Sequence, residues 1–190
     1  MKNFAKRQSG FSMIEVLVSL MILVFGLLGL LGLQARAQIA ELESYQRGQA
    51  LILVQDMVYR INANRKAGGC YVTTTALGTA YSGTPTCTSG SGTTATRAVA
   101  DVDLASWNSA LLGVSEKIGT TSVGSIIGAR GCVSFNATTG IYRVAVAWQG
   151  MAPTISPASA DALATCGQNQ YGADTQRREV SVSFRIATLS

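Results

Sequence analysis

The sequence contains no histidine and few charged residues. Histidine is absent from all 190 residues, and Asp, Glu, Lys and Arg together make up 13%. The lack of histidine removes the most common general base and the most common metal ligand in proteins. The sequence also has no GxxxxGK[ST] phosphate-binding motif and no cluster of metal-ligating residues. We therefore expect a protein that is not an enzyme and that holds neither a cofactor nor a metal.

A concentrated basic patch is also missing. The formal net charge is +5, but Lys and Arg are scattered and form only short pairs such as Lys6-Arg7 and Arg177-Arg178. Nucleic-acid-binding proteins gather such residues on one face or along one helix. Nucleic acid is therefore not expected as the main partner.

The four cysteines contain no CxxC pair. They are Cys70, Cys87, Cys132 and Cys166. This spacing argues against a zinc ribbon or a thioredoxin-type site, and an even number in an exported chain indicates two disulfides. Three pairings are open; sequence order favours Cys70–Cys87 and Cys132–Cys166. Each closed loop would stabilise the fold by about 3 kcal/mol in the chain-entropy model.

One long apolar run follows a short basic segment. Lys2, Lys6 and Arg7 precede it, and residues 11–33 are almost wholly apolar. As a helix, this run would extend roughly 35 Å, enough to cross a bilayer core of about 30 Å. The positive charges would stay in the cytoplasm. Residues after Leu33 would then lie in an oxidising compartment, in agreement with disulfides.

Glu15 is the one acidic residue within this apolar run. An unpaired carboxylate in a bilayer is unfavourable by several kcal/mol, so a partner or an interfacial position is expected. On the residues alone, Glu15 could be solvated at the cytoplasmic interface or paired with Lys6 or Arg7.

The stretch SGFSMIEVLVSLMIL resembles the class III signal of type IV prepilins. In that family a prepilin peptidase cuts after a glycine and methylates the new amino terminus. The resemblance implies a leader of residues 1–10, cleavage between Gly10 and Phe11, and methylation of Phe11. It also implies that Glu15 pairs with the amino terminus of a neighbouring subunit during assembly.

The amino-terminal segment also allows two other interpretations. An ordinary signal peptide could be cut after Ala35-Arg36-Ala37, but the apolar run exceeds the usual 7 to 15 residues and contains Glu15. An uncleaved single-span anchor would leave Gly10-Phe11 and Glu15 without a role. The prepilin interpretation is therefore preferred.

Residues 34–67 continue the helical pattern with more polar residues. Apolar side chains recur with a helical period at positions such as Val54, Met57 and Ile61, and Gly68-Gly69 follows. We predict that residues 34–67 form an amphipathic half of one long helix. A periplasmic globular domain of residues 68–190 would pack against it.

The segment from Cys70 to about Arg97 is rich in Thr, Ser and Gly, which predicts a long surface loop. A short helix is predicted to follow, with Asp103 as its N-cap and Trp107 in the core. Asp161, Asp174 and Glu179 are expected to be solvated surface groups.

Three strands are predicted from alternating side chains. Gly131–Asn136 and Ile141–Trp148 flank a four-residue turn and should form an antiparallel hairpin. A loop over Met151–Asp174 should lead to a third strand over Glu179–Ile186. The segments RGCVSFN, YRVAVAWQG and RREVSVSFRIA resemble the carboxy-terminal half of PilV-type minor pilins.

This resemblance implies an α+β, type IV pilin-like fold: a long amino-terminal helix packed on a small antiparallel sheet, with two disulfides. It implies a minor pilin that primes pilus assembly and supports twitching motility and adhesion. Expected partners are prepilin peptidase, other minor pilins, the major pilin and the assembly platform in the bacterial inner membrane, with incorporation into the extracellular pilus. There are two alternatives: a pseudopilin of a type II secretion system, and an exported binding or adhesive domain with an ordinary signal peptide.

Overall fold

The computed structural model describes residues 12–114, 117–118, 121–122, 126–157 and 165–187. The chain divides into two compact units, Met1–Leu42 and Glu43–Ser190. Each unit is described by itself. The predicted processing residues Gly10 and Phe11 lie outside the described residues.

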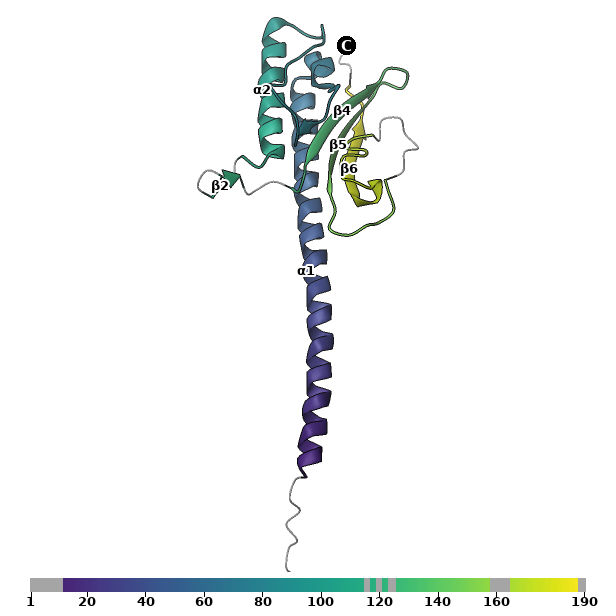
Figure 1. Ribbon diagram of the computed structural model, residues 1–190. Coiled ribbons are helices and arrows are strands. Elements are labelled where there is room, and N and C mark those ends of the chain that lie inside the picture. Colours follow the sequence, from purple (N-terminus) through teal and green to yellow (C-terminus); the bar gives the residue numbers. More distant parts are fainter. Residues whose placement is uncertain (1–11, 115–116, 119–120, 123–125, 158–164, 188–190) are drawn as a thin grey trace, which may run out of the picture. The chain divides into compact units, whose positions relative to one another are not determined.

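Helix α1 (Met13–Ala63) is the longest element, at 51 residues (Figure 1). It ends four residues before the predicted boundary at residue 67, because a 3-10 helix, η1 (Arg65–Tyr71), begins just after Asn64. Within the globular unit, α1 buries one side at Ala50, Val54, Met57 and Ile61. This spacing of three and four residues matches the helical period, so the predicted amphipathic pattern is confirmed for this part of α1.

Helix α2 (Thr94–Leu111) begins ten residues earlier than a helix with Asp103 as its N-cap would. Thr93 is its N-cap, and the side chains of Thr93 and Thr96 form a reciprocal capping box with the backbone. Asp103 lies inside the helix, so its prediction as N-cap is wrong. Trp107 is fully buried, as predicted, and its indole Nε1 donates a hydrogen bond of 2.9 Å to the Leu53 carbonyl of α1.

A four-stranded antiparallel sheet covers the core side of α1, in the order β1-β4-β5-β6. The strands are β1 (Leu77–Gly78), β4 (Arg130–Asn136), β5 (Ile141–Gln149) and β6 (Arg177–Phe184). The predicted hairpin pairs Asn136 with Ile141. The third strand begins two residues before its predicted start and ends two before its predicted end. Strand β1 interrupts the predicted loop, and a separate two-stranded sheet joins β2 (Lys117–Ile118) to β3 (Thr121–Ser122).

The two faces of the sheet bury different side chains. Val144, Val146 and Trp148 of β5 join α1 and α2 in the main core, whereas Ala145 and Ala147 point to a second, smaller cluster. Such alternation follows from the two-residue period of a strand. The long helix, the small antiparallel sheet and the α+β class are therefore confirmed.

A glycine allows β4 to approach α2 closely. A Cβ atom placed on Gly131 would lie 2.4 Å from Cη2 of Trp107 and 2.6 Å from Cδ1 of Leu111. Contacts this short are essentially absent between real Cβ atoms and their neighbours. Only glycine therefore fits at this position without displacing the core.

Two disulfides, Cys70–Cys87 and Cys132–Cys166, tie irregular segments to regular elements. These are the pairs that sequence order favours. The first connects η1 to the segment before α2, and the second connects β4 to the segment before β6. Both stabilise parts of the domain that contain little secondary structure of their own.

Candidate assembly surface

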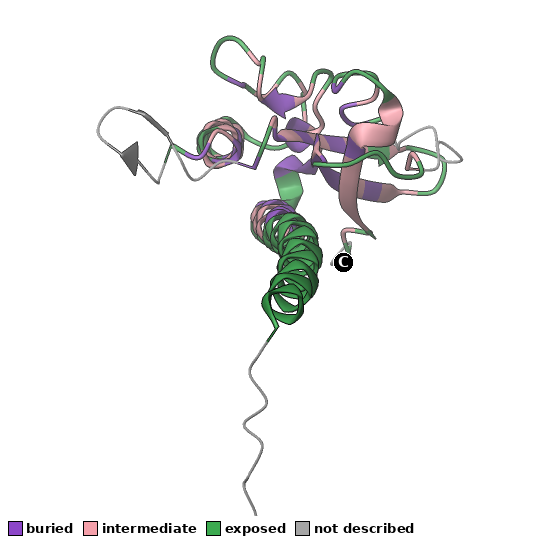
Figure 2. Cartoon of the chain, turned by 60° about the horizontal axis from the view of Figure 1, so that its bottom comes forward, coloured by how far each residue is buried: buried purple, intermediate pink, exposed green. Residues whose placement is uncertain are grey.

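The amino-terminal part of α1 is exposed along its length (Figure 2), and nearly all of its side chains are apolar. Every residue from Met13 to Leu33 is exposed, and large side chains such as Met13, Phe25 and Leu33 are 91%, 62% and 70% exposed. Among the described helices, α1 is long and apolar enough to cross a membrane by length and composition. Water-exposed apolar area of this size is unfavourable, so another apolar phase or partner must cover it.

Glu15 occupies the first turn of this helix. Its backbone N–H donates to the Ser12 carbonyl at 3.0 Å, and its own carbonyl accepts a 2.6 Å hydrogen bond from Ser19 Oγ. A carboxylate is favourable at a helix amino terminus because of the helix dipole. The Glu15 side chain is exposed and has no ion-pair partner within the described part of the chain. It is the one acidic group on an otherwise apolar surface.

Three glycines lie within the same segment. A Cβ atom placed on Gly26, Gly29 or Gly32 would meet nothing within 4 Å. Packing within the described part of the chain therefore does not require glycine at these positions. Small residues do let helix backbones approach one another closely in lipid.

A second exposed apolar set lies on α1 within the globular unit. Tyr45, Ile52 and Tyr59 are seven residues apart and are 60%, 59% and 72% exposed. Seven residues make nearly two helical turns, so the three side chains share one face, roughly opposite the buried Val54 and Met57. Sequence reasoning missed this stripe, although its heptad spacing was visible. We call these three residues the outer stripe.

Charged side chains on the outer face of the sheet form a buried network. The fully buried Arg177 donates to Asp174 Oδ1 through Nε at 2.8 Å and to Glu179 Oε2 through Nη1 at 2.7 Å. Arg143 donates to the other oxygen of Glu179 at 2.8 Å. The Glu179 side chain is only 4% exposed, so the prediction that it is solvated is wrong. The Arg177 guanidinium lowers the pKa of Asp174. Asp161 lies outside the described residues.

A second polar network joins the end of α1 to α2. Arg60 donates to Asp56 at 2.9 Å and to Asp103 at 2.8 Å, and the Tyr71 hydroxyl donates to the other oxygen of Asp103. Burial raises the pKa of Tyr71, and its hydrogen bond to Asp103 raises it further. The role of Asp103 is therefore to pair with Arg60 and Tyr71 across two helices.

Comparisons with known families place two matches on the chain. Residues 32–105 match the family model described as Tt1218-like, type IV pilin Tt1218, and residues 5–31 match the prokaryotic N-terminal methylation motif. The second match includes Gly10, Phe11 and Glu15. No curated protein and no solved structure matched the chain in the same comparisons.

Proposed function

We propose that this chain, which carries a type IV pilin domain behind an N-terminal methylation motif, is a minor pilin that primes assembly of a type IV pilus. The exposed apolar segment Met13–Leu33, with Glu15 as its one carboxylate, carries the proposal. A soluble domain would bury such a surface, whereas a pilin leaves it first to the membrane and later to neighbouring subunits. The chain would act as a structural subunit rather than as an enzyme.

Processing would convert the chain to its assembly-competent form. Prepilin peptidase would cut between Gly10 and Phe11 and methylate the Phe11 amine. The mature helix would hold the subunit in the inner membrane with its globular domain in the periplasm, since the basic residues Lys2, Lys6 and Arg7 precede the apolar run.

Glu15 would then select the axial position of each subunit relative to its neighbour. Its exposed carboxylate has no ion-pair partner among the described residues, and the amine of Phe11 from an adjacent subunit would supply one. Charge neutralisation away from water favours pairing strongly, because an isolated carboxylate in hydrocarbon is unfavourable by several kcal/mol.

The glycines and the outer stripe would support packing between subunits. Gly26, Gly29 and Gly32 leave room for a second helix to approach. Tyr45, Ile52 and Tyr59 would provide a separate contact in the globular unit, because exposed apolar side chains at heptad spacing favour helix–helix packing. Major pilin, other minor pilins and the assembly platform of the inner membrane are the partners this arrangement implies.

The first experiment is amino-terminal sequencing and intact mass of the protein from its native host. A start at N-methylated Phe11 is expected. A start at Gln38 or an intact Met1 would contradict the prepilin pathway.

The second experiment compares Glu15→Gln with Glu41→Gln, a matched change at another exposed glutamate of α1. We expect both proteins to be processed and both to reach the membrane. Each variant is expressed in a strain that lacks the native copy. Only cells with Glu15→Gln should make fewer pili and show reduced twitching and surface adhesion. Normal piliation with Glu15→Gln would refute the docking role, and loss of type II secretion with intact pili would assign the chain to a pseudopilus instead.

A further inference from the structure

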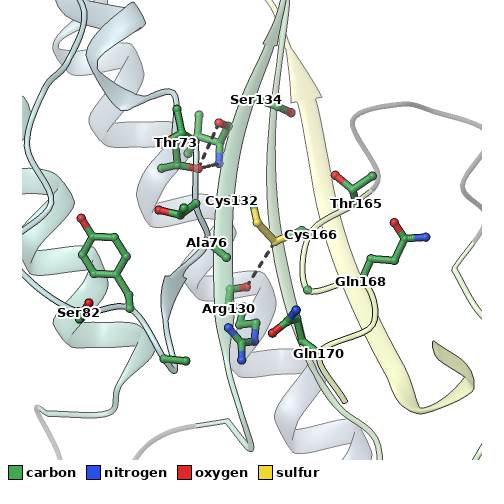
Figure 3. A pocket seen from close by; sticks show the side chains of 16 residues that line it. Thr73, Ala76, Ser82, Arg130, Cys132, Ser134, Thr165, Cys166, Gln168 and Gln170 are labelled. Atoms are coloured by element: carbon green, nitrogen blue, oxygen red, sulfur yellow. Dashed lines mark hydrogen bonds between the residues drawn. A yellow bond between two sulfur atoms is a disulfide. The ribbon is translucent and has the colours of Figure 1, made fainter. Parts of the chain in front are cut away.

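A polar groove crosses the outer face of the sheet, away from the main core. Its volume is about 620 Å³, and it is lined by β4, by residues 73–76 and 80–82, and by residues 165–168 and 170. Figure 3 shows Arg130 and Ser134 along β4, with Ser82 on one side and Gln168 and Gln170 on the other. Ligand sites in proteins commonly have volumes of about 300–1,000 Å³.

The alternation of β4 explains why the floor of the groove is polar. Gly131 and Val133 point into the main core, so Arg130, Cys132 and Ser134 point to the other face. The Cys132–Cys166 disulfide bonds the floor to the segment that forms one wall. The floor and this wall of the groove are therefore held together covalently.

Uncharged polar groups dominate the lining. Threonine and serine hydroxyls come from both walls and from β4, and two glutamine amides come from the segment before β6. Hydroxyl and amide groups both donate and accept hydrogen bonds. Among the described residues, no Asp or Glu lines the groove. This set suits a ligand that carries many hydroxyl groups of its own.

Arg130 is the one charged residue that the described part of the chain contributes to the lining. Its Nε is buried and has no hydrogen-bond partner among the described residues, and its guanidinium lies 5.9 Å from the centre of the Tyr171 ring. Nearby Arg177 and Arg143 are paired with Asp174 and Glu179. Arg130 therefore has no carboxylate partner within the described part of the chain, and its planar donors fit a carboxylate.

We infer that this groove binds an acidic polysaccharide, whose sugar hydroxyls meet the Thr, Ser and Gln groups and whose uronate carboxylate meets Arg130. The groove is open, which allows a chain of sugars to pass through it. The inference does not depend on assembly, because neither the apolar segment of α1 nor the outer stripe contributes to this lining. It adds a ligand to a protein whose proposed role is structural.

The test uses the full mature chain in detergent, titrated at about 150 mM salt with two fluorescently labelled probes. One probe is a hexamer of guluronate and the other is maltohexaose, which is neutral. We expect saturable binding of guluronate and much weaker binding of maltohexaose. Equal binding of both probes, or no binding of guluronate, would overturn the inference.

Two variants and one control locate the site. Arg130→Gln should weaken guluronate binding about tenfold, since one charge-assisted contact is lost. Arg185→Gln removes the same charge from an exposed position outside the groove and should leave binding within about twofold, because it removes only long-range attraction. Equal losses in these two variants would mean nonspecific attraction to a basic protein and would overturn the inference. Ser82→Tyr fills the groove from an exposed position and should abolish guluronate binding without changing the melting temperature. Unchanged binding in this folded variant would also overturn the inference.

Discussion

Glu179 lies between two arginines in the buried network, and its replacement should destabilise the domain. Glu179→Gln keeps the shape of the side chain but removes the charge that Arg143 and Arg177 share. Removing one partner of a buried ion pair typically lowers the free energy of unfolding by about 3–5 kcal/mol. Asp174 still pairs with Arg177, so we expect the lower end, about 3 kcal/mol. For a domain of this size the melting temperature would fall by about 6–12 °C.

Intrinsic fluorescence is a suitable assay, because the two tryptophans, Trp107 and Trp148, are both buried in the globular unit. Urea titration of the full chain in detergent would then report unfolding of that unit. Glu41→Gln, on an exposed part of α1, is the matched control. A Glu179→Gln protein within about 0.5 kcal/mol of the wild type would refute the reasoning, since ordinary surface substitutions fall in that range.

Three further predictions use the same assay. Gly131→Ala should lower the free energy of unfolding by about 1–3 kcal/mol through overpacking. Gly48→Ala, at an open helical position, should raise it by up to about 1 kcal/mol. A Gly131→Ala protein more stable than Gly48→Ala would contradict the packing described. Because burial raises the pKa of Tyr71, unfolding releases a proton at high pH, so stability should be full below about pH 10 and fall above it, less steeply in Tyr71→Phe. A pH profile identical in the two proteins would argue against this. Replacing both Cys132 and Cys166 by Ser removes a disulfide that closes a separation of 34 residues and should lower stability by about 4 kcal/mol. Reductant should then destabilise this variant less than the wild type, because only Cys70–Cys87 is left to reduce; an equal effect of reductant on both proteins would contradict this.

Local sequence patterns were enough to predict the elements that depend on periodicity. The buried positions Val54, Met57 and Ile61 follow the helical period, and the β4–β5 hairpin follows strict alternation around a turn. The cysteine pairs were favoured by sequence order, though two other pairings were open. These features required no knowledge of which distant segments meet.

The start of α2 and the role of Asp103 could not be predicted in this way. The first turns of α2 contain Thr and Ala with few large apolar residues, so their pattern resembles a loop, and the capping box uses Thr96 where Glu or Gln is usual. Asp103 looks like an N-cap until α1 brings Arg60 within 2.8 Å of it. Contacts between distant segments decided both outcomes.

Part of the candidate site could be predicted from the sequence and part could not, because contacts between distant segments are not visible in local patterns. Glu15 was identified because a carboxylate is conspicuous in an apolar run, and the structure adds that its side chain is exposed. The groove around Arg130 combines three segments that are far apart in sequence, and Glu179 became a buried partner only when β6 paired with β5. Neither could be found from spacing alone.

The position of β6 at the end of the strand order has a consequence for how this sheet resists mispairing. An edge strand offers its unpaired backbone to any extended chain, and inward-pointing charges are one way in which proteins discourage such additions. In β6, Arg177 and Glu179 alternate with Val180 and Val182, which join the core. A shift of β6 by one residue would drive an ion pair into the apolar core and expose the valines. The same two charges that stabilise the outer face therefore also penalise a pairing of β6 that is shifted by one residue, which discourages mispairing at this edge of the sheet.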